Sequence, residues 1–168
     1  DENEYSKYLS AHGGSSNAYT AAEDTVYYFD VNQEHFGGAL DRFAQFFIAP
    51  LFTEAATARE MNAVDSENAK NLQADVWRFM QLKKSLARED HPMHKFSTGN
   101  LQTLRDLPAE AGIDLRARLL AFHKAHYSAN LMRLVVLGKE TVAELEAMVE
   151  ASFAAVPNTD IAAPAFEP

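Results

Sequence analysis

Apolar side chains recur at three- and four-residue intervals in several parts of the 168-residue chain, a pattern typical of helices that bury one face. The predicted helices cover residues 1–12, 34–49, 53–89, 114–127 and 141–155. The third stretch has no Gly or Pro, so it fits one kinked helix or two consecutive helices. Its second half predicts one buried stripe, formed by Leu72, Val76, Phe79, Leu82 and Leu86.

Two local signals refine these helices. The pair Gly37 and Gly38 weakens the first turns of the second helix, so we expect that helix to pack closely against a neighbour there. Thr141 and Glu144 have the spacing of a capping box, which predicts the start of the last helix.

Two neighbouring segments are typical of strands. Residues 24–32 form a dense β-branched and aromatic run, and residues 15–20 have the small, polar composition of an exposed strand. Only a few residues separate them, so an antiparallel pair is the simplest arrangement. A buried strand is also predicted over residues 131–137. Because the strands are segregated from runs of helix, the sequence predicts an α+β fold with an antiparallel-rich sheet packed by helices.

The composition limits the classes of function. Hydrophobic residues make up 47% of the chain and its formal charge is −9, so it is a folded protein without the basic surface that nucleic acid requires. Basic peptides would suit its charge better. Because the chain has no cysteine, thiol catalysis and thiolate ligands are excluded, and any metal must be held by His, Asp or Glu.

The hydropathy of the chain and its first residue give two expectations about the intact molecule. No apolar run approaches the ~20 residues that span a bilayer, so we predict no membrane span. The first residue is Asp1 and not Met, so we expect residues upstream of Asp1 to belong to the functional molecule. The sequence leaves open whether that molecule is periplasmic or cytoplasmic.

Two carboxylates lie at a regular spacing in the longest helical stretch. At ~100° per residue, Glu60 and Glu67 fall within roughly 20° of the same helix face and about 10 Å apart along the axis. One could bind a metal ion while the other steadies the site. Glutamate is also a strong helix former, and glutamates on one helix stripe usually form a solvated face, so the spacing alone favours that interpretation.

The histidines are weaker candidates for metal ligands. Two pairs have HxxH spacing, His91 with His94 and His123 with His126. The first pair lies in a loop that contains Pro92, and the second lies at a helix end, where histidine is favourable for dipole reasons alone. The chain contains no HExxH or HxxEH motif, no phosphate-binding loop and no G-x-S-x-G elbow.

A series of segments carries a family resemblance. In chain order they are residues 5–9, 12–20 (HGGSSNAYT), 28–31, 38–44, 50–52, 62–67 (NAVDSE), 95–100 (KFSTGN) and 127–132. Taken together, they resemble the pitrilysin and insulin-degrading-enzyme family of inverted-motif zinc metallopeptidases, peptidase family M16. The resemblance covers almost the whole chain and corresponds to the later part of the family's first, catalytic domain.

The resemblance implies roles for the two glutamates. In the family, zinc is held by two histidines of an HxxEH helix and by a glutamate far downstream, and the motif's own glutamate is the general base. The resemblance makes Glu67 the downstream zinc ligand and Glu60 an acidic residue that supports the catalytic site. HxxEH is expected upstream of Asp1. Because this chain lacks the motif, we predict that it has no peptidase activity alone and binds zinc weakly or not at all.

The resemblance also implies a role for the strand near residues 15–20. Family members present such an edge strand to the substrate, which pairs with it as an added strand. Asn17, Ala18 and Tyr19 are therefore expected to bind peptide substrates, although an ordinary edge strand blunted by small residues fits the same composition. Trp77 and Phe79 could line the cleft, but we expect them in the core.

The predicted organisation is a partial catalytic domain, residues 1–156, followed by a linker to a further domain, residues 157–168. The predicted function is that of a fragment of a zinc-dependent metalloendopeptidase that hydrolyses peptides and small proteins, with the remainder of the parent chain as its partner. The alternative is a homologous non-catalytic domain that has lost HxxEH and serves a binding or structural role.

Overall fold

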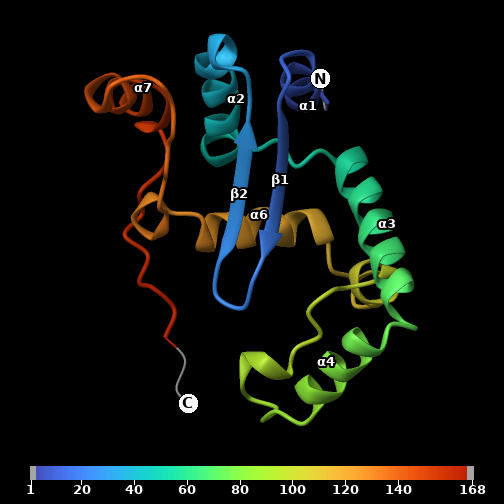
Figure 1. Cartoon of the computed structure of the whole chain (residues 1–168). Coiled ribbons are helices and arrows are strands. Elements are labelled where there is room, and N and C mark those ends of the chain that lie inside the picture. Colours follow the sequence, from blue (N-terminus) through green and yellow to red (C-terminus); the bar gives the residue numbers. More distant parts are fainter. Residues whose placement is uncertain (1–2, 166–168) are drawn as a thin grey trace. The chain divides into compact units, whose positions relative to one another are not determined.

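The computed structural model describes residues 3–165, and the chain divides into two compact units. Unit 1 combines Asp1–Leu51 with Tyr127–Ile161, and unit 2 combines Phe52–His126 with Ala162–Pro168. Both units consist mainly of helices, and among the described residues the only sheet is an antiparallel pair in unit 1 (Figure 1). The predicted α+β class is confirmed.

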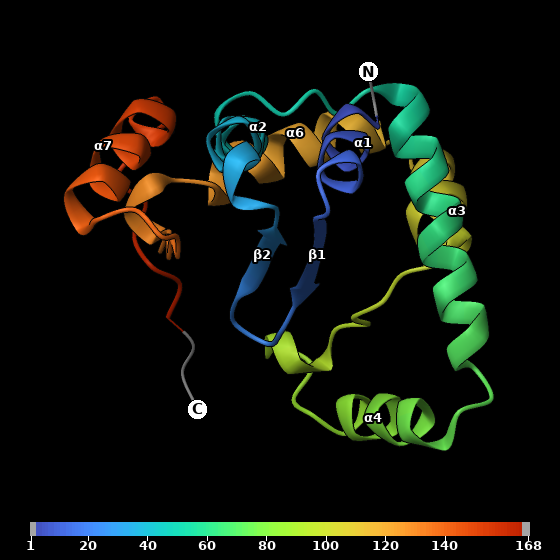
Figure 2. The same cartoon turned by 45° about the horizontal axis from the view of Figure 1, so that its top comes forward.

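Unit 1 holds the sheet and three of the predicted helices. In chain order it contains α1 (Glu4–Ala11), β1 (Ser15–Thr20), β2 (Thr25–Asp30), a 3-10 turn (Gln33–His35), α2 (Phe36–Ile48), a second 3-10 turn (Ala129–Leu131) and α7 (Val142–Phe153). Helices α1 and α2 both lie at the end of the hairpin where β1 begins and β2 ends (Figures 1 and 2). That end of the hairpin is therefore covered by helix.

The sheet is a two-stranded antiparallel hairpin, as predicted. Its register runs from Ser15 opposite Asp30 to Thr20 opposite Thr25. Side-chain hydrogen bonds close both ends, because Ser15 Oγ donates to Asp30 Oδ1 at 2.7 Å and the hydroxyls of Thr20 and Thr25 are 3.1 Å apart. An isolated hairpin is marginally stable in water, so this one depends on the helices packed beside it.

The core of unit 1 centres on α2. The buried apolar side chains are Leu9, Ala39, Leu40, Phe43 and Ala44. The Phe43 ring lies 5.0 Å from the ring of Phe29 on β2 and 6.4 Å from the ring of Phe153 on α7. The apolar face predicted for α2 is thus the surface against which the sheet and α7 pack.

The close approach expected at the glycine pair occurs at Gly38. A Cβ there would overlap the hydroxyl oxygen of Tyr8 on α1. A Cβ at Gly37 would meet only Met148 Cε, at 3.7 Å. Helix α1 packs against α2 in this way only because residue 38 has no side chain.

Helix α7 begins with the predicted capping box. Thr141 Oγ1 accepts a hydrogen bond from the Glu144 N–H at 3.4 Å, and the Glu144 carboxylate accepts one from the Thr141 N–H at 2.8 Å. The hydroxyl of Thr141 also donates to that carboxylate at 2.8 Å. The Thr141 side chain and then its backbone lower the pKa of Glu144 below its ordinary value, because both favour the ionised carboxylate.

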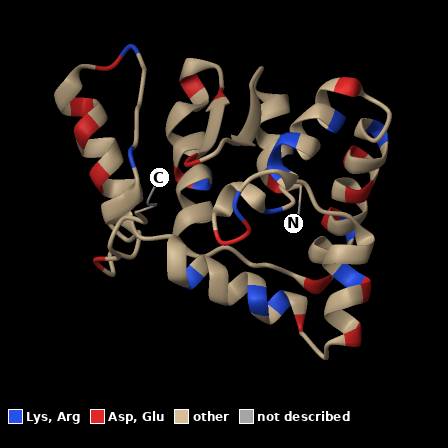
Figure 3. Ribbon diagram, turned by 90° about the horizontal axis from the view of Figure 1, so that it is seen from below, with Lys and Arg blue, Asp and Glu red and all other residues tan. Residues whose placement is uncertain are grey.

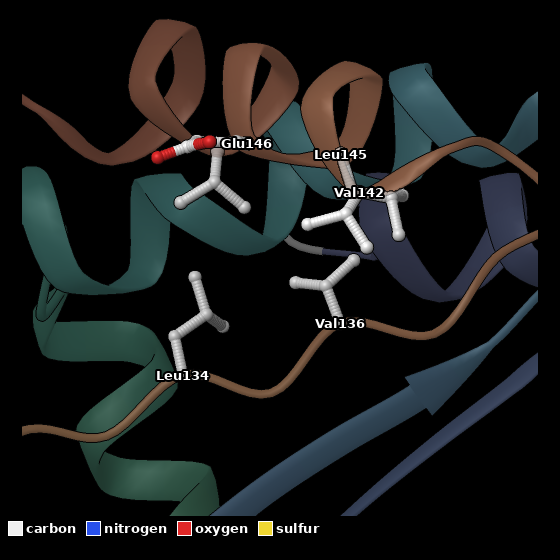
Figure 4. Close-up of a pocket in the computed structure, with 6 residues that line it drawn as sticks. Leu134, Val136, Val142, Leu145 and Glu146 are labelled. Carbon is white, nitrogen blue, oxygen red and sulfur yellow. The ribbon is translucent and has the colours of Figure 1, made fainter.

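The strand predicted over residues 131–137 is wrong for the described part of the chain. Ala129–Leu131 forms a 3-10 turn, and residues 132–138 are an extended segment that pairs with no other strand there. Leu134 and Val136 point toward α7 (Figure 4), while Val135 is 91% exposed. The β-rich composition predicts an extended backbone correctly, but a strand also needs a neighbour for its backbone N–H and C=O groups.

Unit 2 contains the longest helix. Its elements are α3 (Glu54–Asn71), α4 (Asp75–Ser85), a 3-10 turn (Pro92–His94), a π-helical turn (Gln102–Asp106), α5 (Leu107–Glu110) and α6 (Leu115–His126). The long helical stretch is therefore two consecutive helices, one of the two predicted arrangements. Ala74, with φ −86° and ψ 119°, has an extended backbone that separates them.

The buried stripe predicted for the second half of this stretch is wrong in the structure. Its five apolar side chains are exposed, from 56% at Leu82 to 79% at Leu86. Trp77 and Phe79, which we expected in the core, are 44% and 74% exposed. The spacing identifies the apolar side of α4, but the described residues leave that side in contact with solvent.

Among residues 3–165, no Asp, Glu, Lys or Arg residue is fully buried. Lys and Arg are scattered among Asp and Glu along the ribbon (Figure 3). Some form ion pairs, such as Arg42 Nε with Glu4 Oε1 at 2.7 Å. Within residues 3–165, no helix has the length and apolar character needed to cross a bilayer.

Candidate metal ligands and substrate strand

Helix α3 carries both candidate glutamates on an unbroken stretch. Thr53 caps its start, since Thr53 Oγ1 accepts a hydrogen bond from the Ala56 N–H at 3.2 Å. No Gly or Pro interrupts the helix. Continuous helix therefore places Glu60 and Glu67 within roughly 20° of one face and about 10 Å apart along the axis, as the spacing predicts. Both side chains are exposed.

The other side of α3 is held by the rest of unit 2. Asp65 lies about 140–160° around the helix from the two glutamates, and its Oδ1 accepts a hydrogen bond from the Leu101 N–H at 2.9 Å. Among residues 3–165, neither the Glu60 nor the Glu67 carboxylate forms a hydrogen bond or an ion pair. Both are therefore available as oxygen donors, and carboxylate oxygen is one of the ligand types that zinc accepts.

The histidine pairs have other contacts. His91 Nδ1 accepts a backbone N–H two residues further on, at 3.1 Å, and His94 Nδ1 lies 3.1 Å from Ala87 O. His123 packs against Phe52, with ring centroids 5.5 Å apart, and burial lowers its pKa. In the described part of the chain, no three His, Asp or Glu side chains lie together as a metal-binding group.

Strand β1 carries the candidate substrate-binding residues. Asn17, Ala18 and Tyr19 lie opposite Tyr28, Tyr27 and Val26 of β2. All six residues of β1 are exposed, and β2 is its only strand partner in the described residues. Its other edge has backbone groups that an added strand can use. Asn17 Oδ1 accepts the Ala18 N–H at 2.8 Å, so that amide is covered until the Asn17 side chain moves.

A tyrosine pair next to this strand was not predicted from the sequence. The hydroxyl of Tyr27, whose partner across the sheet is Ala18, is 2.6 Å from the hydroxyl of Tyr127. Burial raises the pKa of Tyr27 well above its ordinary value, and the hydrogen bond with Tyr127 raises it further. The pair fastens β2 to the chain that follows α6. Because 100 residues separate the two tyrosines, no local pattern indicates their contact.

Comparisons with known proteins cover most of the chain. Residues 1–90 match the family model described as Insulinase (Peptidase family M16), and residues 114–168 match the one described as Peptidase M16 inactive domain. The chain is similar to the Insulin-degrading enzyme-like 1, peroxisomal, of Arabidopsis thaliana, with 55% identity over 166 residues. It is also similar to the Schizosaccharomyces pombe protein named "Putative zinc protease mug138", with 50% identity over 166 residues.

The same comparisons define the extent of the match. Each of these two alignments covers 99% of this chain and 17% of the relative. Among solved structures, the chain is similar to the crystal structure of pitrilysin, with a TM-score of 0.91 and 36% sequence identity. That match again covers 99% of this chain and 17% of the other. The chain therefore spans 17% of the length of these proteins.

Proposed function

Because this chain belongs to peptidase family M16, as its match over residues 1–90 shows, we propose that it is part of the catalytic domain of a zinc-dependent metalloendopeptidase that hydrolyses peptides and small proteins. Residues 1–156 form the later part of that domain in this proposal, and residues 157–168 lead to a following domain. One relative is named as a zinc protease, which supports zinc as the metal.

The observation that carries the proposal is that the Glu67 carboxylate is accessible to a metal ion. Its carboxylate is exposed and unpaired among the described residues, on a helix whose opposite side is fixed by Asp65. In the proposed site Glu67 is one zinc ligand, while two histidines and the general base come from an HxxEH motif upstream of Asp1. When bound, zinc polarises the scissile carbonyl and activates water for attack. Glu60, on the same helix face, steadies the site through its negative charge.

We infer that β1 binds the substrate. A peptide would add to its open edge through the backbone groups of Asn17, Ala18 and Tyr19, displacing the Asn17 side chain from the Ala18 N–H. Backbone pairing of this kind fixes an extended substrate conformation with little dependence on its sequence. The formal charge of −9 favours basic peptides as substrates.

The glutamate roles are tested in the parent protein by measuring its zinc content together with kcat/KM on a fluorogenic peptide. Glu67→Gln is expected to lose zinc and to lower kcat/KM at least ~100-fold, because a ligand is removed. Glu60→Gln is expected to lower zinc affinity or activity about 10- to 100-fold, as the loss of a supporting residue does. Glu54→Gln, an exposed glutamate on the same helix, is the matched control and should leave both unchanged. Full zinc occupancy in Glu67→Gln would contradict the assignment.

The isolated chain gives a second test. We expect it to have no peptidase activity and to bind zinc weakly, so calorimetric titration should show no tight stoichiometric binding. Tight binding would mean that this chain holds a complete zinc site. It would contradict the proposal that two of the zinc ligands lie upstream of Asp1. If the parent protein lacks HxxEH and contains no zinc but still binds peptides, the non-catalytic alternative is correct.

A further inference from the structure

Five side chains form a layered cluster beside the open end of the hairpin. The imidazoles of His12 and His35 are stacked, with ring centroids 3.5 Å apart and planes 19° apart. The Tyr8 ring meets both edge-on, at 4.6 and 6.4 Å. The Arg42 guanidinium lies 3.9 Å from the centre of the Tyr8 ring and is ion-paired with Glu4 at 2.7 Å. The zinc site proposed above makes no use of this cluster.

The two histidines lie on either side of the hairpin in the chain. His12 ends α1 shortly before β1, and His35 immediately precedes α2, shortly after β2. Backbone groups make the same connection, because the Asn32 N–H donates to His12 O at 3.1 Å. The Tyr8 hydroxyl donates to His35 O at 3.2 Å. The stack therefore ties the chain that enters β1 to the chain that leaves β2.

Glycines provide the space that the close packing around His12 and Tyr8 requires. Gly13 has a φ of +70°, a left-handed conformation in which a side chain is strained. A Cβ at Gly14 would overlap the carbonyl oxygen of Asp30, and a Cβ at Gly38 would overlap Tyr8. Gly13 and Gly14 therefore permit the backbone conformation found between His12 and β1. The stacked rings lie beside this segment.

Within the sheet, strand β1 is supported from one side. All six of its residues are exposed, and it pairs with a single strand in the described residues. A strand that serves as a template must already be extended and in register, since otherwise the incoming peptide must order it and binds more weakly. An aromatic pair changes an opening equilibrium by about 2- to 10-fold, which is enough to affect substrate affinity.

We propose that the His12–His35 stack positions β1 for pairing with the peptide substrate, so that both histidines are positioning residues that set the KM of the peptidase. The proposal rests on the function proposed for β1. Neither imidazole touches the substrate or the reacting atoms. Their effect passes through the backbone conformation of β1, so it changes substrate binding and leaves the chemical step unchanged.

Steady-state kinetics of the parent peptidase on a fluorogenic peptide test the proposal. His35→Ala is expected to raise KM about 10-fold and to change kcat less than about 2-fold. His35→Phe keeps a ring on His12 and should return KM to within about 2-fold of the unmodified enzyme. His126→Ala removes a ring contact of similar distance, 4.5 Å to Phe122, but in unit 2, and it should change neither constant.

Amide hydrogen exchange of the present chain separates this proposal from the proposed function. His35→Ala should speed exchange of the β1 amides about 10-fold relative to those of α3, and His35→Phe should not. If β1 exchange is unchanged, the stack does not hold the strand and the proposal fails, whatever the enzyme does. A fall in kcat equal to the rise in KM, or no rescue by Phe, also overturns it. A parent protein without peptidase activity refutes the proposed function, and with it the substrate role assigned to the stack.

Discussion

Helices α2 and α4 have similar apolar periodicity and opposite burial. On α2, Leu40 is 2% exposed and Phe43 is 8% exposed, whereas on α4 Val76 and Phe79 are 71% and 74% exposed. Helix α2 packs against α1 and α7 within unit 1, while α4 contacts the short turn Pro92–His94 in unit 2. Periodicity therefore identifies which side of a helix is apolar, but a neighbouring element decides whether that side is buried.

Truncating one phenylalanine on α2 and one on α4 should give the largest difference in the free energy of unfolding. Phe43→Ala is expected to lower the free energy of unfolding by about 3–5 kcal/mol, because it leaves a cavity among the rings of Phe29, Phe47 and Phe153. Phe79→Ala, at an exposed position, should change it by about 0.5 kcal/mol or less. Urea unfolding of both variants measures the contrast. Equal losses would show that the α4 stripe is covered in solution.

The next effect concerns how closely α1 approaches α2. Gly38→Ala is expected to cost about 1–3 kcal/mol, because the new Cβ meets the Tyr8 hydroxyl. Gly37→Ala is the matched control on the same helix, and it should be neutral or stabilising by up to about 1 kcal/mol, since alanine favours helix. Thermal unfolding of both variants should separate them. A stable Gly38→Ala protein would mean that the Tyr8 side chain or α1 itself can move away from α2.

A smaller effect is expected at the start of α7, the helix that packs on α2. Thr141→Ala removes the capping hydrogen bond to the Glu144 N–H and should cost about 1 kcal/mol at neutral pH. Because Thr141 lowers the pKa of Glu144, the ionised carboxylate stabilises the fold above its ordinary pKa of 4.5, and this stabilisation is lost as the pH falls through the lowered value. Thermal unfolding from about pH 7 to about pH 3 should therefore show the variant approaching the unmodified protein in acid. A constant difference would exclude the Glu144 contribution.

The smallest change in stability is expected for the polar replacement Phe79→Gln on α4. It should alter the free energy of unfolding by about 0.5 kcal/mol or less but reduce concentration-dependent self-association, because it interrupts an exposed apolar stripe. Sedimentation velocity over a range of concentrations measures this. Ser85→Gln, beside the same stripe, is the polar control and should leave association unchanged. A loss of stability above about 1 kcal/mol would indicate a buried Phe79.

Most elements of the fold are predictable from the sequence because their signals are local. The two-residue capping pair, Thr141 and Glu144, begins α7 as its spacing predicts. The dense β-branched and aromatic run forms β2, and its neighbour forms β1 in antiparallel register. Residues 132–138 differ, because an extended backbone becomes a strand only beside another strand, and the described residues supply none.

In the candidate site, too, some features follow from the local sequence and others depend on neighbouring elements. The common helix face of Glu60 and Glu67 depends only on an unbroken helix, so the sequence determines it, and the family resemblance adds the zinc role that remains to be tested. The exposure of Trp77 was not predictable, since it depends on what covers α4.

The sequence alone determined the positions of the main helical stretches, the hairpin and the family, because each is encoded by neighbouring residues or by an ordered series of motifs. Only the tertiary structure decided which apolar stripe is buried, and only it brought Tyr27 to Tyr127 and His12 to His35. The physical reason is that burial and ring stacking each require two parts of the chain to come into contact. A pair separated by 23 or 100 residues forms only when the whole unit folds.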